Sequence, residues 1–177
     1  LTLLLIIVVV LLPHLPTVNP KFYPVSVDTL IYKDFLEYAK TKGLLEALRK
    51  FKGFARPLYF IAIYFSNKLI GNPILLMDVI HHIVALLLLS LTSYYVGKKL
   101  FNEDVGLLSM ILTPIGHTAL SFIAGGFQAN SIALPIALIL LTIGLKSYIK
   151  LLLVMTLLAC IHPWTFIMYS AIYVIYS

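Results

Sequence analysis

Asp28 is the carboxylate whose neighbours best suit it to chemistry. The chain has only seven acidic residues, and Asp28 lies in a stretch with helical periodicity, Val25-Ser26-Val27-Asp28-Thr29-Leu30-Ile31-Tyr32-Lys33-Asp34. A carboxylate at the start of a helix can accept a hydrogen bond from a first-turn backbone N–H, as an N-cap. It can also take a proton from a substrate hydroxyl as a general base. The residues alone leave both roles open for Asp28.

Asp78, His81 and His82 form a second group of residues that could do chemistry. Their spacing of three and four residues places them on overlapping faces of one helix. Oxygen and imidazole ligands at this spacing could hold a metal or relay a proton. Ligands from one helix do not complete a metal site, however, and no second cluster in the sequence supplies the rest. We therefore predict no metal site here.

The one sizeable polar loop, residues 13–55, must position Asp28. Helical spacing within it predicts two short amphipathic helices near 28–42 and 44–52, ended by Gly43 and Gly53. The apolar face of the first consists of Ile31, Phe35, Tyr38 and Ala39. Because Lys and Arg occupy the polar sides, we expect both helices to lie along the membrane surface.

Composition defines the fold class. Hydrophobic residues make up 61% of the 177 residues and charged residues 11%, whereas soluble domains average about 45–50% and 25%. We predict an all-α polytopic membrane protein with six to seven transmembrane helices. The expected spans are 1–12, 57–70, 74–96, 105–124, 131–145, 151–161 and 163–177. A single helix over 151–177, kinked at Pro163, is an equal alternative for the last two.

The chain opens and closes inside apolar runs. We therefore expect residues 1–177 to be a single transmembrane module truncated at both ends, with 13–55 as its first extracytoplasmic loop.

Several function classes find no support in the sequence. It has no Gly-rich phosphate loop, nucleophile elbow or zinc-ligand spacing, and Cys160 is the only cysteine. Most of the net charge of +6 lies in 21–56, where we expect it to meet lipid phosphates and no nucleic acid. A non-enzymatic transporter or channel-like subunit remains the alternative to an enzyme. The charge lies mainly in loops, which favours the enzyme.

The order of features resembles a known family. After the Asp28-to-Tyr32 spacing and the two surface helices come Arg56-Pro57-Leu58-Tyr59-Phe60, a Leu-Ile-Gly-Asn turn, a long span and the basic exit Gly97-Lys98-Lys99-Leu100-Phe101. Over roughly residues 1–150 this order resembles the GT-C superfamily of membrane glycosyltransferases. The nearest likeness is to protein O-mannosyltransferases and to aminoarabinose transferases that act on lipid A.

The resemblance implies roles for five residues. Asp28 matches the family's catalytic aspartate, which acts as a base or metal ligand. Tyr32 and Asp34 match the tyrosine and the acidic residue that follow it. Arg56 matches a basic residue near the donor phosphate, and Tyr59 belongs to the aromatic opening of the next span.

Two departures from the family pattern bear on metal dependence. Thr29 stands where the family often has Glu, and Gln128-Ala129-Asn130-Ser131 stands where some members carry another Asp. No cofactor follows from the residues themselves. The resemblance leaves a divalent metal, Mg²⁺ or Mn²⁺, as an open alternative.

The implied function is transfer of a sugar from a polyprenyl-phosphate-linked donor to a protein, lipid or glycan acceptor. The implied partners are this donor and the lipid bilayer, and the implied location is the cell membrane, with several spans. The lysines alone would place loop 13–55 in the cytoplasm. The resemblance places it outside, and we adopt the latter because long loops follow the charge rule less strictly.

Overall fold

The computed structural model describes residues 1–54, 56–125, 128–140, 142–143 and 147–176. Regular structure in these residues is helical, which confirms the all-α prediction. The α-helices are α1 (Thr2–Leu11), α2 (Thr29–Lys42), α3 (Leu44–Lys50), α4 (Pro57–Ile70), α5 (Pro73–Leu75), α6 (His81–Leu100), α7 (Glu103–Leu112), α8 (His117–Gly125), α9 (Gln128–Leu140), α10 (Tyr148–Ile161) and α11 (Pro163–Tyr176).

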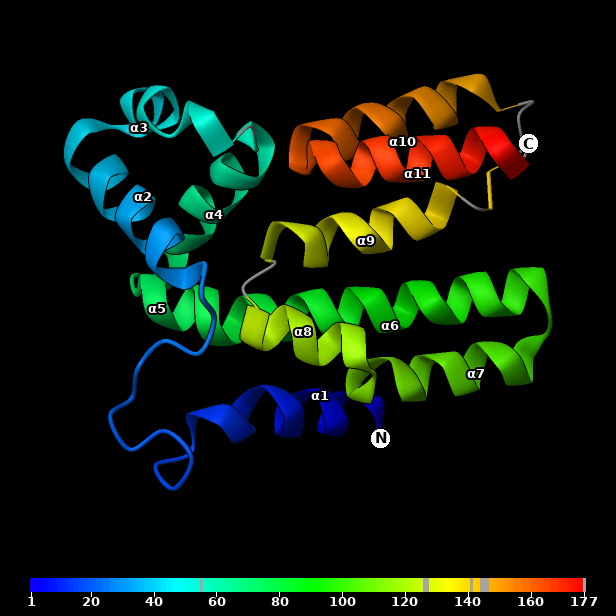
Figure 1. Ribbon diagram of the computed structural model, residues 1–177, viewed down its shortest axis with the longest axis horizontal. Coiled ribbons are helices and arrows are strands. Elements are labelled where there is room, and N and C mark those ends of the chain that lie inside the picture. The colour runs from blue at the N-terminus through cyan, green and yellow to red at the C-terminus, as the bar shows by residue number, and fades with distance from the viewer. Residues whose placement is uncertain (55, 126–127, 141, 144–146, 177) are drawn as a thin grey trace.

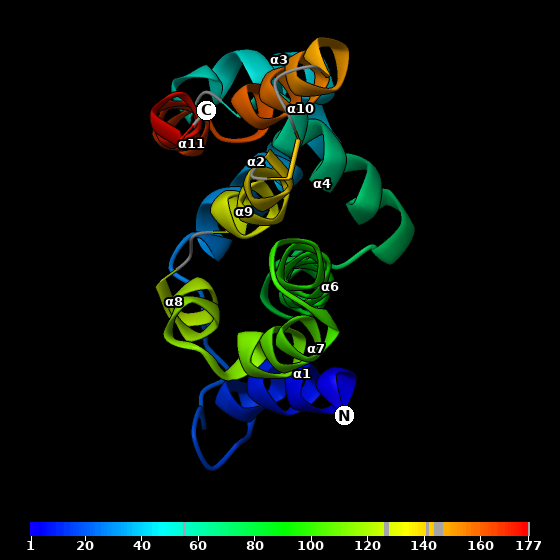
Figure 2. The same cartoon turned by 90° about the vertical axis from the view of Figure 1, so that its right-hand side faces the viewer.

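The helices fall into two groups by direction. α6, α7, α9, α10 and α11 run along the long axis of the molecule, and α1 runs along it too, in contact with α6 (Figure 1). α2, α3 and α4 gather at one end of this axis. Viewed along the axis, α6 appears end-on while α4 runs across it (Figure 2). The stretch 57–70, predicted as a span, is therefore a helix that crosses the direction of α6.

In the part of the chain that the structure describes, two helical stretches are long and apolar enough to cross a membrane, by length and composition. They cover Pro73–Leu100 and Glu103–Gly125, in agreement with the predicted spans 74–96 and 105–124. α1, α9, α10 and α11 are apolar but shorter. The end of the predicted span 131–145 and residue 177 lie outside the described residues.

The first of these stretches contains an irregular turn. Residues Leu76–Ile80 form a π-helical turn between α5 and α6. Such a turn inserts one extra residue into a helix and is frequent at functional sites. It carries Asp78, which is buried.

α10 and α11 form a hairpin. The chain reverses at His162, whose backbone is extended, and Pro163 starts α11. The Ser170 hydroxyl donates to the Met155 sulfur at 3.4 Å across the pair. The alternative of one kinked helix over 151–177 is therefore wrong.

α6 and α7 form a second hairpin, and glycines set its spacing. A Cβ on Gly97 would lie 3.0 Å from the Gly106 Cα, and a Cβ on Gly106 would lie 2.8 Å from the Tyr94 carbonyl oxygen. The two backbones thus approach more closely than any side chain would allow. Asn102 begins α7 by accepting a hydrogen bond from the Val105 N–H at 2.9 Å.

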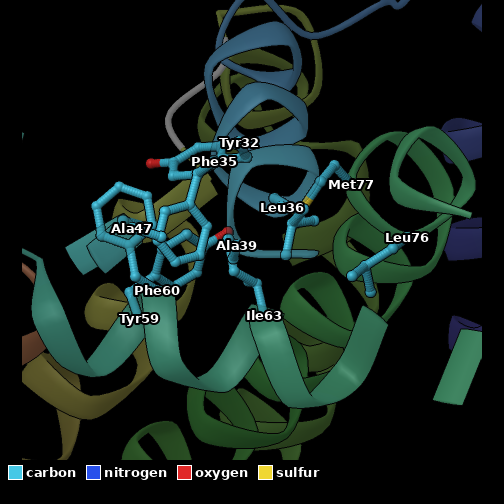
Figure 3. Packing of buried hydrophobic residues seen from close by; sticks show 11 residues of the cluster. Tyr32, Phe35, Leu36, Ala39, Ala47, Tyr59, Phe60, Ile63, Leu76 and Met77 are labelled. Atoms are coloured by element: carbon cyan, nitrogen blue, oxygen red, sulfur yellow. The ribbon is translucent and has the colours of Figure 1, made fainter. Parts of the chain in front are cut away.

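α2 and α3 match the predicted helices near 28–42 and 44–52, although residues 52–54 form a separate 3₁₀ turn. Gly43, with φ of 86°, allows the chain to turn between them. The apolar face of α2 packs on α4 and on the π-helical turn (Figure 3). Its buried residues are Tyr32, Phe35, Leu36 and Ala39, next to Phe60 and Ile63 of α4 and Met77.

Candidate functional site

Four of the five predicted site residues lie near one another where α2 packs against the start of α4. The Arg56 guanidinium donates to the Tyr32 hydroxyl at 2.6 Å. The Tyr32 and Tyr59 rings meet edge to face, with centroids 5.1 Å apart. Asp28 is partly buried one turn before Tyr32, within electrostatic reach of Arg56. We call Asp28, Tyr32, Arg56 and Tyr59 the Asp28 cluster.

Local sequence explains how the cluster forms. Asp28 and Tyr32 are four residues apart, so they lie on one side of α2. Arg56 immediately precedes Pro57, which suits the first position of a helix because it needs no backbone N–H there. Tyr59 follows in the first turn of α4. Packing of α2 on α4 then brings the two helix starts together.

The environment alters the acid–base properties of Asp28 and Tyr32. Burial raises the pKa of the Asp28 carboxyl above its ordinary value, and the nearby Arg56 charge partly opposes this rise. Burial also raises the pKa of Tyr32 to about 12, again against the effect of Arg56. Asp28 is therefore a stronger base than an exposed aspartate, and Tyr32 stays neutral at physiological pH.

Asp28 occupies the N-cap position of α2, but its side chain makes no capping hydrogen bond. Its backbone carbonyl accepts from the Tyr32 N–H at 3.2 Å in the ordinary helical manner. The N-cap role weighed from the sequence is thus not realised by this carboxylate.

Asp34 does not join the cluster. It lies six residues after Asp28 and two after Tyr32, which turns it toward the opposite side of α2. Its side chain is exposed.

Asp78, His81 and His82 point to three different places. The Asp78 carboxylate faces the start of α2. His81 Nε2 lies 3.0 Å from both the Gln128 carbonyl oxygen and the Ser131 hydroxyl, while its Nδ1 lies 3.3 Å from the Tyr59 hydroxyl. His82 Nε2 lies 3.1 Å from the Phe122 carbonyl oxygen. The shared helix face predicted from their spacing does not bring these side chains to one point.

A divalent metal does not fit the Asp28 cluster. Asp28 is the only carboxylate among its four members, and the charge that acts on it is the Arg56 cation. Within the described residues, no group of three His, Cys, Asp or Glu side chains is arranged to hold a metal. Chemistry at this cluster therefore rests on the carboxylate, the guanidinium and the two phenols.

Two polar residues beside the cluster escaped the sequence interpretation. The Gln128 amide donates to the Thr29 hydroxyl at 2.9 Å, and the Thr29 hydroxyl donates to Asp78. In the sequence both residues stand out only as departures from the GT-C pattern. The signals for them in the sequence are slight: Gln128 opens a mostly apolar helix, and Thr29 follows Asp28 directly.

The fold and this cluster stand without support from similarity: no family model, no curated protein and no solved structure matches the chain.

Proposed function

We propose that this protein is a membrane glycosyltransferase that moves a sugar from a polyprenyl-phosphate-linked donor to a hydroxyl acceptor. One observation supports this most directly. Asp28, a partly buried carboxylate with a raised pKa, has no capping bond and lies within reach of the Arg56 cation. A base beside an anion-binding group is the pair that such a transfer requires.

The reaction uses the two charges differently. The acceptor oxygen attacks the anomeric carbon of the sugar, the bond from that carbon to the phosphate oxygen breaks, and polyprenyl phosphate leaves with the bonding electrons. Asp28 takes the acceptor's proton, an effect typically worth about 10²–10⁴-fold in rate. Arg56 stabilises the negative charge that develops on the departing phosphate, with the directional donors of a guanidinium.

Tyr32 and Tyr59 have supporting roles in this proposal. The Tyr32 hydroxyl accepts from Arg56 at 2.6 Å and so orients the guanidinium. Tyr59 packs on the Tyr32 ring and restricts its movement. Because the pKa of Tyr32 is raised to about 12, it does not compete with Asp28 as the base at neutral pH.

The position of the cluster suits a lipid-linked donor. α2 and α4 lie at one end of the long helices (Figure 1). A polyprenyl chain dissolves in the bilayer and its phosphate lies at the surface, so a site at the end of the membrane helices can receive it. We propose further that the apolar helices make several crossings of the cell membrane and that loop 13–55 faces away from the cytoplasm.

Replacing the base tests the proposal. In membranes that contain the full-length protein, Asp28→Asn should abolish sugar transfer from a polyprenyl-phosphate donor, because the amide cannot take the proton. The expression level should stay unchanged, and so should the helix content of the protein extracted in detergent. Asp34→Asn is the matched control, since it neutralises an exposed carboxylate on the same helix. Transfer by Asp28→Asn at the wild-type rate would refute the proposal.

The phosphate-binding role has a separate test. Arg56→Ala should reduce transfer and raise the KM for the donor, and Arg56→Lys should restore part of the loss because it keeps the positive charge. A kcat and a donor KM that are both unchanged in Arg56→Ala would place the phosphate elsewhere.

The orientation is tested in a Cys160→Ser background. A cysteine placed at Lys42 or Lys50, in the polar part of loop 13–55, should react with an impermeant maleimide added to intact cells. Labelling only after permeabilisation would reverse the topology.

A further inference from the structure

The start of α2 is tied to the long apolar helix through one carboxylate. Asp78 is only 2% exposed. One of its oxygens accepts from the Val25 N–H at 2.7 Å. The other accepts from the Ser26 N–H at 3.4 Å and from the Thr29 hydroxyl. Asp78 therefore holds the segment 25–29, which contains Asp28.

Gln128 completes this arrangement from a third helix. Its side-chain amide donates to the Thr29 hydroxyl at 2.9 Å and to the Met77 carbonyl oxygen at 3.4 Å. Because the Thr29 oxygen accepts from Gln128, its single proton is directed to Asp78. The first residue of α2 is thus fixed between the π-helical turn and α9.

A buried carboxylate in this position is costly unless it is fully paired. Three donors converge on Asp78, and charge-assisted hydrogen bonds are about twice as strong as neutral ones. Ionisable residues within apolar helices are rare and usually have a function. The hydrogen bonds of Asp78 end next to Asp28, whose own side chain makes no capping bond.

We propose that Asp78 is a positioning residue: it holds segment 25–29 and thereby keeps the Asp28 carboxylate opposite Arg56. This inference rests on the proposed glycosyltransferase activity for its catalytic consequence, while the structural tie can be measured by itself. In this proposal Thr29, one residue after the base, acts as the link between Asp78 and Gln128.

Three variants test the tie. Asp78→Asn keeps the shape but replaces one acceptor oxygen with an NH₂ group. Thr29→Val keeps the volume and removes the hydroxyl, whereas Thr29→Ser retains it as the matched control. If Asp78→Asn does not fold, the comparison of Thr29→Val with Thr29→Ser still tests the tie.

The first measurement is amide hydrogen exchange in detergent, followed in peptides that cover residues 20–32. Asp78→Asn and Thr29→Val should speed exchange there by about tenfold or more, given the strength of hydrogen bonds to charged groups. The α6–α7 hairpin should exchange as in the wild type, and Thr29→Ser should resemble the wild type throughout. Unchanged exchange of 20–32 in both variants would overturn the tie.

The second measurement is steady-state sugar transfer. A displaced base lowers kcat and leaves donor binding intact, so Asp78→Asn and Thr29→Val should lower kcat about tenfold or more. The donor KM should stay within about twofold, and Thr29→Ser should restore kcat. Faster exchange with unchanged kcat would overturn the positioning role. Faster exchange in a protein whose wild type transfers no sugar would confirm the tie and refute the proposed function instead.

Discussion

The α6–α7 hairpin and the α2–α4 pair bring helices together by opposite means. In the hairpin, Gly97 and Gly106 remove the side chains that would keep the backbones apart. In the α2–α4 pair, aromatic rings fill the space, and Phe60 lies at their centre, with the Phe35 ring 4.3 Å and the Tyr32 ring 5.8 Å away. The hairpin should therefore be damaged by added volume and the α2–α4 pair by lost volume.

The two kinds of packing differ in how well they can hold polar groups, and the Asp28 cluster lies at the α2–α4 pair. Two backbones in direct contact leave little room for long side chains, and the hairpin is suited to rigid packing. Rings of different size and tilt leave edges where a hydroxyl or a guanidinium can enter. Tyr32 shows this, because its ring packs in the aromatic core while its hydroxyl meets Arg56.

The largest effect is expected for Phe60→Ala. Phe60 is 2% exposed and touches rings from α2 and from residues 51–54. Loss of a buried Phe typically costs about 3–5 kcal/mol of stability. Thermal unfolding in detergent, followed by circular dichroism, should show the loss.

Phe65→Ala is the matched control for Phe60→Ala, since it removes the same side chain from a half-exposed position on the same helix. A similar loss of stability in both variants would mean that the ring cluster does not hold α2 on α4.

A smaller loss, about 1–3 kcal/mol, is expected for Gly106→Ala, as for other overpacked sites. The new Cβ would meet the Tyr94 carbonyl oxygen at 2.8 Å and the Lys98 nitrogen at 3.0 Å, both backbone atoms that cannot turn aside. The helices must move apart, and cysteine cross-linking across the α6–α7 contact should become slower. Unaltered stability and cross-linking would show that the hairpin tolerates a wider spacing.

Substitutions in the two regions should also differ in their effect on the pH dependence of sugar transfer. Asp28 must be ionised to act as a base, so transfer should decline as the pH falls through its pKa, which burial raises. The Arg56 charge lowers this pKa, so Arg56→Gln should move the acid limb of the kcat/KM profile to higher pH. Gly106→Ala should leave the acid limb in place. A shift of the limb to lower pH in Arg56→Gln would contradict the assignment of Asp28 as the base.

The smallest effect is expected for Gly53→Ala. Among the described residues, no heavy atom lies within 4 Å of a Cβ at this position, and the backbone does not need glycine. The change in stability should stay within about 0.5 kcal/mol. A large loss would show that an added methyl group is harmful without a close backbone contact, and a loss of stability in Gly106→Ala would then say nothing about the spacing of α6 and α7.

Periodicity and composition predicted the parts of this fold that depend on local sequence. The two amphipathic helices followed from the spacing of residues such as Phe35 and Ala39, and the two long apolar stretches followed from composition. The burial of the α2 face by α4 could not be predicted, because an apolar face fits a lipid surface and a protein surface equally well.

The candidate site could be predicted only in part. The GT-C resemblance named Asp28, Tyr32, Arg56 and Tyr59, and the structure brings them together. It also named Asp34, although helical geometry turns that residue away from Tyr32. The role of Asp78 was hidden because a π-helical turn changes the directions that ordinary helical spacing assigns to Asp78, His81 and His82.

The π-helical turn at Leu76–Ile80 corresponds to one extra residue within an otherwise continuous helix. Each residue of an α-helix advances by about 100°. Removing one residue from this turn would rotate Asp78 by that angle relative to α6 and detach it from segment 25–29. One extra residue thus places a carboxylate on a buried face while the rest of the helix keeps its contacts. The protein gains a polar anchor for loop 13–55 without any change in the loop itself.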